Sequence, residues 1–263
     1  MRSEVIEAIF MQVNSAPVNM EPLSDAIEWH EGEEPLVAED ELKIALEHLE
    51  IDIDDLYYDE NAFAFLDRFV YFDGLVWVGI SSFDMEYLEF SQRKKAIHSG
   101  KEMIGKFISE DNWSMAFVLM DKRISMANFI LLKDQVPKDQ LIDVFAEVWV
   151  RAESGFDMFD NDMIREIYAK GEPSKRFLEA KAHLTSISNE EGFLTVYRGV
   201  NDTTEDALSW SLKKDVAEWF SSRFNKIGTL EEARVHVDNV IDYFDFRNEF
   251  EVLVFPENID KDN

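Results

Sequence analysis

The chain has 263 residues, of which 46% are hydrophobic and none is cysteine, and its formal net charge is −29. This length allows one large domain or two small ones with a sizeable core. The lack of cysteine excludes disulfides, thiolate metal ligands and thiol nucleophiles. The negative charge disfavours bulk binding to nucleic-acid phosphates. It is either a solubility feature of the surface or a docking surface for a basic partner.

The charge is unevenly distributed along the chain. Residues 1–100 hold 23 acidic and 6 basic residues, which leaves 32 acidic and 20 basic residues for the rest. We therefore expect an acidic N-terminal region of unknown role over residues 1–105 and the functional domain over 106–263. No apolar run approaches the ~18 residues of a membrane span, and the run Met1–Phe10 is too short and acidic for a signal peptide. We expect a soluble, cytoplasmic protein that does not associate with membranes.

Three elements are predicted in the N-terminal region. Ser3 can cap a short helix, and a second helical pattern covers Glu39–Leu49. Two apolar runs, Phe63–Val70 and Leu75–Ile80, flank Asp73-Gly74. This dipeptide between apolar runs predicts a β-hairpin with a type I′ turn.

Residues 106–190 show the apolar periodicity of helices, and we interpret them as a helical lead-in. The predicted helices run from Ser109 to Leu131, over Lys138–Ala152 behind Pro137, after Asp160, and over Ser174–Leu184.

Residues 191–257 change to short strand patterns. Strands are predicted around Arg198, over Asp206–Ser211, over Ala233–Val240 and over Glu249–Phe255, with a helix over Lys214–Phe224 and an aromatic-rich loop over Ile241–Asn248. Helices followed by strands predict an α+β domain.

Polar residues stand at fixed places in these strands. A buried arginine at position 198 needs an anion, either a phosphate or carboxylate of a ligand or a local acid in a structural salt bridge. Ser209 and Ser211 share one face of their strand, and Glu249 and Glu251 share one face of theirs, with Phe250 opposite. Paired carboxylates can stabilise a cation and handle a proton, although acids are also common on solvated strand faces.

Other chemistry is disfavoured by the sequence. The five histidines have no metal-ligand spacing, and the acidic cluster Asp52–Asp55 lacks the glycine turn of a calcium loop. No glycine-rich phosphate loop and no serine elbow is present. We expect no metal.

Taken together, Tyr197-Arg198-Gly199, Ser209-Trp210-Ser211 and Glu249-Phe250-Glu251 resemble the motifs of the R-S-E class of ADP-ribosyltransferases, which includes actin-modifying toxins and bacterial and phage proteins. The resemblance covers residues 193–256. It implies an α+β fold with a split β-sandwich core at residues 191–257, and NAD as the substrate that donates ADP-ribose.

The resemblance also implies roles for single residues. Arg198 would hold the NAD phosphates and nicotinamide ribose, Ser209 would position the catalytic glutamate, and Ser211 would be more structural. Phe220 would lie against nicotinamide, Arg223 would reach the pyrophosphate, and Phe246 would recognise the acceptor. Glu251 would be the catalytic acid, and Glu249 would engage the acceptor. Trp210 departs from the small middle residue of the serine motif.

These roles require folding to bring Arg198, Ser209 and Glu251 around a single cleft. The implied activity is mono-ADP-ribosyl transfer to a macromolecule, with protein arginine favoured, in a toxin or a phage or bacterial effector. An antitoxin or inhibitory partner is compatible with it. The alternatives are ADP-ribosylation of RNA, DNA or a small molecule, and a catalytically dead binding module with the same fold.

Overall fold

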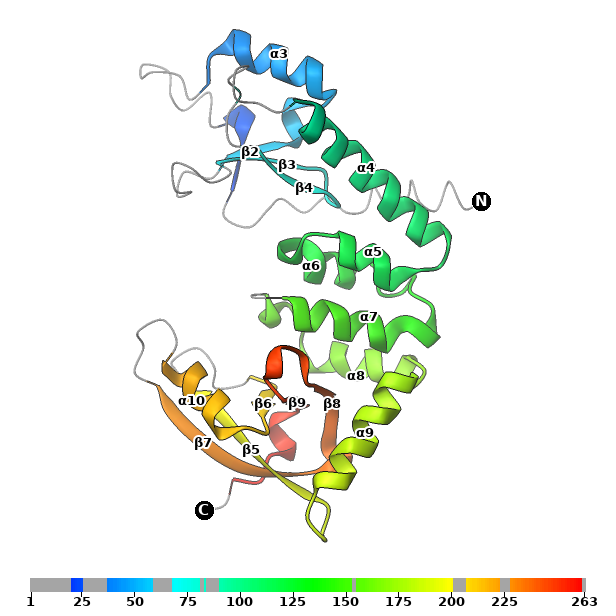
Figure 1. Ribbon diagram of the computed structural model, residues 1–263, viewed down its shortest axis with the longest axis vertical. Coiled ribbons are helices and arrows are strands. Elements are labelled where there is room, and N and C mark those ends of the chain that lie inside the picture. Colours follow the sequence, from blue (N-terminus) through cyan, green and yellow to red (C-terminus); the bar gives the residue numbers. More distant parts are fainter. Residues whose placement is uncertain are drawn as a thin grey trace. The chain divides into compact units, whose positions relative to one another are not determined.

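The computed structural model describes residues 20–25, 37–58, 68–80, 83, 90–152, 155–200, 207–222 and 228–261. The chain divides into two compact units, Met1–Pro137 with Glu147–Met158 and Lys138–Ala146 with Phe159–Asn263. Figure 1 shows the elements of each unit. The boundary that we expected at residue 105 falls inside the continuous helix α4 (Phe90–Ser109). The helix predicted after Ser3 lies outside the described residues.

The first unit combines a small antiparallel sheet with helices. Its sheet has the order β1-β2-β3-β4. The described elements are β1 (Glu21–Pro22), α3 (Glu39–Leu49), β2 (Leu56–Tyr58), β3 (Phe69–Phe72), β4 (Trp77–Ile80), α4, α5 (Trp113–Leu119), α6 (Lys122–Leu132) and the last residues of α7 (Lys138–Arg151), with short 3-10 turns at Ile53–Asp55 and Phe156–Met158.

The predicted hairpin is confirmed, but its turn is longer than the sequence suggested. Phe72 pairs with Trp77, so residues 73–76 form the connection in place of a two-residue turn. The Asp73 carboxylate accepts hydrogen bonds from the amides of Leu75 at 3.1 Å and Val76 at 2.9 Å. A side chain that satisfies these amides stabilises the wider turn. Gly74 adopts the positive φ of 90° that the turn needs.

The helical pattern that starts at Ser109 forms two helices where one was predicted. α5 ends at Leu119 and α6 begins at Lys122. The Asp121 side chain accepts a hydrogen bond from the amide of Arg123 at 2.9 Å, as an N-cap residue does. A capping aspartate therefore interrupts an apolar periodicity that continues on both sides of it.

The second unit places helices before strands, as the sequence predicted. Its described elements are the first residues of α7, α8 (Asn161–Lys170), α9 (Lys175–Ile187), β5 (Phe193–Val200), β6 (Ser209–Ser211), α10 (Lys214–Ser222), β7 (Thr229–His236), β8 (Val240–Phe244), η5 (Phe246–Asn248) and β9 (Glu251–Val254), with 3-10 turns at Val237–Asn239 and Pro256–Asn258. The protein is thus mixed α+β with two antiparallel sheets.

The five-stranded sheet of this unit has the order β7-β5-β6-β9-β8. β5 pairs with β7 along its whole length, from Phe193 opposite His236 to Val200 opposite Thr229. β5 pairs with β6 only at Tyr197 opposite Ser211. The β5–β6 junction is therefore a seam between two better-paired groups of strands. One face of the sheet forms the core with α9, through Leu184, Val196, Trp210, Val235, Val252 and Val254.

One strand lies where a loop was expected. β8 covers residues that the sequence suggested were part of an aromatic-rich loop over Ile241–Asn248, and β7 ends at His236, before the predicted limit of Val240. All residues of β8 are buried, including Asp242. A strand that is buried throughout lacks the alternation that identifies a half-buried strand.

In the part of the chain that the structure describes, no helix combines the length and the apolar character needed to cross a membrane.

Candidate active site

The sheet brings the three motif-bearing strands side by side. β5 carries Arg198, β6 carries Ser209 and Ser211, and β9 begins at Glu251. These strands are consecutive neighbours in the sheet, with β6 in the middle. Segments that are far apart in the sequence therefore meet on rigid elements, which hold side chains more precisely than loops do.

The strand register decides which side chains share a face. Tyr197 lies opposite Ser211, and Ser211 lies opposite Glu251. Directly opposed residues of antiparallel strands project to the same face, and neighbours along a strand alternate. Ser209, Ser211 and Glu251 consequently occupy one face of the sheet. This is the face opposite to the one that packs against α9 through Trp210.

Arg198 is on the other face, with Trp210. Its guanidinium carbon is 4.5 Å from the centroid of the Trp210 ring, which is a cation–π distance. The structure therefore brings Ser209 and Glu251 to one face but does not place Arg198 beside them there. The arrangement that we expected, with all three residues around one cleft, is not observed, because Ser209 and Glu251 share one face and Arg198 lies on the other.

Arg198 is buried, with 8% of its side chain exposed, and it has partners within the protein. Nη1 donates to the carbonyl oxygen of Ala207 at 2.6 Å, and Nη2 donates to the Glu231 carboxylate at 3.1 Å. The local salt bridge, which the sequence left open as an alternative, is therefore present. Because Ala207 leads into β6, the Arg198 side chain also bridges the seam between β5 and β6, beyond the Tyr197–Ser211 pair.

Ser211 holds the backbone that precedes Glu251. Its hydroxyl donates to the carbonyl oxygen of Glu249 at 2.7 Å and accepts from the amide of Lys213 at 3.0 Å. The amide of Leu212 donates to the carbonyl oxygen of Phe250 at 3.0 Å. These contacts connect the end of β6 to the residues that precede Glu251.

The strand predicted over Glu249–Phe255 begins two residues later, at Glu251. Phe250 has a φ of 49°, so the chain is not extended there and Glu249 lies outside the strand. The regular strand that would place the two glutamates on a common face is absent. Arg247 and Asn248 also have positive φ, 60° and 58°. Such clustering of costly backbone conformations is typical of functional sites.

The family resemblance implies roles for two aromatic residues, Phe246 at the acceptor and Phe220 at nicotinamide. Phe246, in η5, has 55% of its surface exposed. Phe220 is half-buried on α10 and packs edge-on against Trp219, with ring centroids 4.9 Å apart. Arg223, the second arginine expected at the pyrophosphate, lies outside the described residues.

α10 is held close to β5 by a glycine. A Cβ atom at Gly199 would lie 2.4 Å from both the Ala217 carbonyl oxygen and the Ser221 amide nitrogen of α10. Only glycine permits that approach. In Tyr197-Arg198-Gly199, the glycine thus sets the position of the helix that carries Phe220. Since residues alternate along β5, this helix lies on the face of Tyr197, which is also the face of Ser211 and Glu251.

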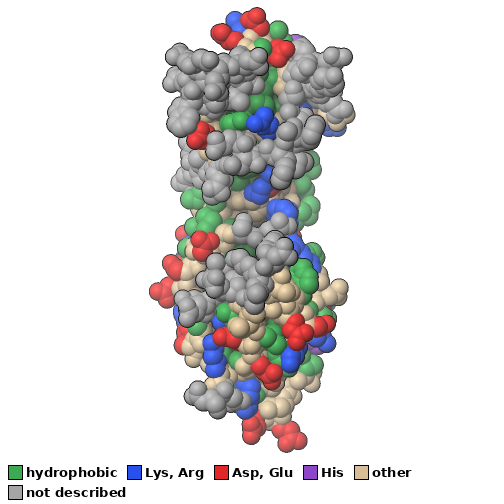
Figure 2. Space-filling view, turned by 90° about the vertical axis from the view of Figure 1, so that its left-hand side faces the viewer, with side chains coloured by type: hydrophobic (Ala, Val, Ile, Leu, Met, Phe, Trp, Pro, Cys, Tyr) green, Lys and Arg blue, Asp and Glu red, His purple; other side chains and the backbone are tan. Residues whose placement is uncertain are grey.

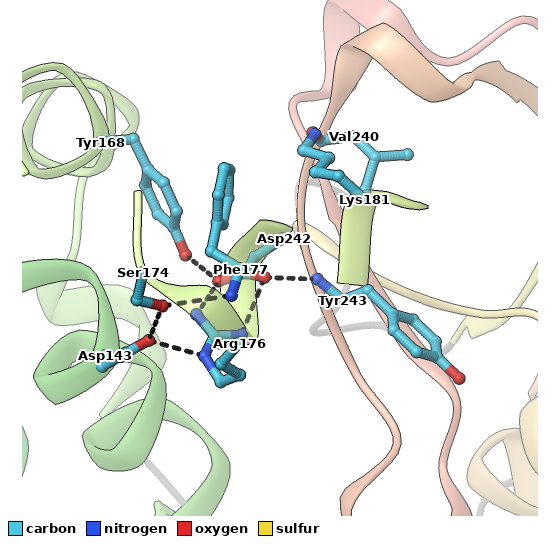
Figure 3. Close-up of polar contacts among 9 residues, drawn as sticks. All are labelled: Asp143, Tyr168, Ser174, Arg176, Phe177, Lys181, Val240, Asp242 and Tyr243. Carbon is cyan, nitrogen blue, oxygen red and sulfur yellow. Dashed lines mark hydrogen bonds and ion pairs between the residues drawn. The ribbon is translucent and has the colours of Figure 1, made fainter. Parts of the chain in front are cut away.

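No local pattern in the sequence indicates the ionic network that surrounds the buried Asp242 of β8. Figure 3 shows Arg176 between Asp143 and Asp242, with Tyr168 also directed at Asp242. Arg176 donates to both Asp242 oxygens, at 3.0 and 2.8 Å, and to Asp143 at 2.8 Å. The Tyr168 hydroxyl donates to Asp242 at 2.7 Å. Burial, reinforced by the Asp242 charge, raises the pKa of Tyr168 well above its usual range.

This network is saturated with internal hydrogen bonds. Asp242 also accepts from the amide of Tyr243 at 2.8 Å. Burial acts to lower the pKa of Arg176. Its hydrogen bonds and the charge of Asp242 outweigh this effect, and the pKa of Arg176 is therefore raised. We therefore assign the network a structural role, because a buried charge such as that of Asp242, when it is paired and hydrogen-bonded, stabilises one arrangement of the chain.

The surface of the second unit carries both signs of charge. On the face that Figure 2 shows, acidic and basic side chains lie interspersed. Among the described residues, no cluster of three or more histidine, aspartate or glutamate side chains could hold a metal ion.

Comparisons with protein-family models, with curated proteins and with solved structures find no match.

Proposed function

We propose that this protein is a mono-ADP-ribosyltransferase that cleaves NAD between nicotinamide and ribose and transfers ADP-ribose to a macromolecule. One observation carries the proposal: the strands with the arginine, serine and glutamate motifs are consecutive in one sheet, with Ser211 directly opposite Glu251. The proposal includes the split β-sandwich core that the family resemblance implies. The single residue pair between β5 and β6 supports it.

The proposed chemistry follows from the charge that develops on ribose. Departure of nicotinamide leaves an oxocarbenium-like ribose, and an ionised Glu251 that bonds a ribose hydroxyl would stabilise this state. Ser209 lies on the face of Glu251 and would bind the same ribose. Phe220, on the helix above this face, would hold the nicotinamide ring.

Arg198 would bind the pyrophosphate from the seam between β5 and β6. Its contact with the Ala207 carbonyl places the guanidinium where the two strands cease to pair. Because Arg198 lies on the face of Trp210 and Glu251 on the opposite face, this role requires NAD to reach across the seam, with its phosphates at Arg198 and its nicotinamide ribose at Glu251. A guanidinium is suited to this role because its planar donors match phosphate oxygens.

The acceptor we favour is a protein arginine, and the loop before Glu251 would engage it. Phe246 is exposed there, and the Glu249 carboxylate would orient the acceptor guanidinium and assist proton loss. The protein's charge of −29 favours a basic target over RNA or DNA. Incubation of protein and RNA fractions with labelled NAD would distinguish these acceptors, because label in RNA alone would contradict the favoured one.

Glutamine substitutions test the catalytic roles. Glu251→Gln should lower nicotinamide release by about a thousandfold, since losing one charge-stabilising group in a transition state commonly has that effect. Glu249→Gln should lose transfer to a protein acceptor but keep part of the NAD hydrolysis. Both products are measured by chromatography, and circular dichroism checks the fold. Full activity in Glu251→Gln would end the assignment.

The ion pair of Arg198 with Glu231 favours a second candidate, a binding module without catalysis. An arginine that already meets a carboxylate at 3.1 Å has a structural role without any ligand. This candidate predicts no nicotinamide release by the wild-type protein at any NAD concentration, whereas the enzyme predicts release that depends on Glu251.

A further inference from the structure

Glu231 joins the cation of the proposed NAD site to a second cation. One of its oxygens accepts from Arg198 at 3.1 Å, and the other accepts from the Lys261 ammonium at 3.1 Å. The exposed fractions of the side chains are 8% for Arg198, 30% for Glu231 and 58% for Lys261. A carboxylate therefore stands between a buried guanidinium and a solvated ammonium.

The backbone fixes this arrangement from both sides. Arg198 and Glu231 are directly opposite each other in the β5–β7 ladder. Arg234 of β7 and Asp260 exchange two backbone hydrogen bonds of 2.9 Å, which hold the segment with Lys261 along the same strand. Lys261 is thus placed beside Glu231 by strand pairing as well as by its own charge.

The charges predict a conflict when an anion binds. A pyrophosphate that reaches Arg198 comes close to the Glu231 carboxylate, and like charges at such short range repel each other. Glu231 can leave Arg198 without losing its counter-ion, because Lys261 is already in contact with it. Removal of one partner from a buried pair is costly only when the other is left uncompensated.

We infer that Glu231 is an internal competitor for anions at Arg198 and that Lys261 takes over its carboxylate when a pyrophosphate binds. This inference deepens the proposed function and rests on it for the identity of the ligand, NAD. We call this exchange of ion-pair partners the handover. The Arg198 guanidinium releases the Glu231 carboxylate and binds a phosphate, and Glu231 keeps its contact with Lys261 alone. Glu231 and Lys261 regulate affinity for the dinucleotide and take no part in the bond cleavage.

A double-mutant cycle tests the handover, with inorganic pyrophosphate as the probe and titration calorimetry as the measurement. Glu231→Gln should bind pyrophosphate about tenfold more tightly than the wild type, because removal of a charge close to a binding anion commonly changes affinity on that scale. Lys261→Met should bind it several-fold more weakly. In the double variant the effect of Lys261→Met should vanish, since no carboxylate remains to be taken over.

A second ion pair in the same unit supplies the control. Lys175 and Glu179 are 3.6 Å apart on the surface of α9. Lys175→Met and Glu179→Gln remove the same charges, and they should change pyrophosphate affinity little and additively. Thermal unfolding of every variant shows whether the fold is kept.

The outcomes separate the handover from the proposed function. Any of four results would overturn the handover. Two concern single variants: weaker pyrophosphate binding by Glu231→Gln, or no effect of Lys261→Met. The other two are additive effects in the double-mutant cycle, or no pyrophosphate binding by either the wild type or Glu231→Gln. Nicotinamide release from NAD is measured in parallel. If nicotinamide is released but the double-mutant cycle fails, the proposed function stands without the handover. If the cycle succeeds but no nicotinamide is released, the proposed function is wrong and the handover applies to another anionic ligand.

Discussion

The Ser211 hydroxyl makes its two hydrogen bonds at the point where β6 meets the loop that precedes Glu251. It donates to the carbonyl oxygen of Glu249 and accepts from the amide of Lys213. One small side chain therefore links the residues that follow β6 to the residues that precede β9. The loop needs such support, because Arg247, Asn248 and Phe250 all have positive φ. Each conformation of this kind costs on the order of 1 kcal/mol or more in a non-glycine residue.

Ser211→Ala should therefore destabilise the second unit by about 1–3 kcal/mol, the usual effect of removing a hydrogen-bonding partner from part-buried backbone groups. Urea unfolding followed by circular dichroism measures this. Ser186→Ala is the matched control, because within the described part of the chain the exposed Ser186 hydroxyl donates only to the carbonyl of His183 in the same helix. Equal stability of the two variants would show that the loop does not depend on Ser211.

At the scale of elements, the candidate site depends on how closely α10 approaches β5. Gly199 and Gly228 both lie against backbone atoms of Ser221, at distances that no side chain tolerates. α10 also has an outer face, on which Trp219 is 56% exposed. The helix thus packs through its small residues and leaves aromatic surface outward, beside the half-buried Phe220.

Gly199→Ala should displace α10 and destabilise the protein by about 3 kcal/mol, at the upper end of the usual range for overpacking. Gly100→Ala is the contrasting variant. Gly100 lies within helix α4, and a Cβ atom there would have the methyl groups of Val76 as its nearest neighbours, at 3.4 Å. Alanine there should leave stability unchanged or raise it by up to about 1 kcal/mol. Thermal melts of both variants test the pair, and a Gly199→Ala protein as stable as the wild type would contradict the tight docking of α10.

The sequence predicted local elements well where a short-range pattern exists. The alternation in β5, the capping aspartate before α8 and the apolar face of α3 all identified the correct elements. It failed where the pattern is absent, as in the wholly buried β8, or misleading, as in α4, which continues through the boundary that we expected at residue 105. Long-range pairs leave no local pattern either. Asp242 and Arg176 are 66 residues apart, and Arg198 and Glu231 are 33.

The same limit applies to the candidate site. Alternation within β6 correctly grouped Ser209 with Ser211, and the register with β9 added Glu251. The face of Arg198 could not be predicted, because it depends on how β5 and β6 align. A motif therefore indicates which residues lie on neighbouring strands but not which of them project together.

At the scale of the whole molecule, the ionic network around the buried Asp242 connects the helices α8 and α9 to the strands of the same unit. Tyr168 of α8 and Arg176 of α9 both donate to Asp242 of β8, and Arg176 also donates to Asp143 of α7, as Figure 3 shows. Helices from the predicted lead-in are thereby attached to the sheet by charge as well as by apolar contacts. Unfolding of this unit must expose the network, so its stability is linked to pH.

Tyr168 sets the sign of that linkage in alkaline solution. Its pKa is raised in the folded protein, first by burial and then by Asp242, so the folded state keeps the proton above pH 10 while an unfolded tyrosine releases it. The unfolded state then binds fewer protons, and the free energy of unfolding falls as pH rises above about 10. Lys181 acts in the opposite direction just below pH 10.5, because burial lowers its pKa.

Tyr168→Phe separates the hydrogen bond to Asp242 from the effect of the phenol proton on stability. The variant loses the hydrogen bond to Asp242 and should be less stable than the wild type by about 1–2 kcal/mol at pH 7. Above pH 10 the difference should shrink, because phenylalanine has no proton to lose on unfolding. Urea midpoints measured between pH 7 and 11 give both curves, and Tyr243→Phe is a suitable control, since the pKa of Tyr243 is also raised by burial although its hydroxyl is not directed at Asp242. Parallel curves for the wild type and Tyr168→Phe would mean that this tyrosine does not control the alkaline limit of stability.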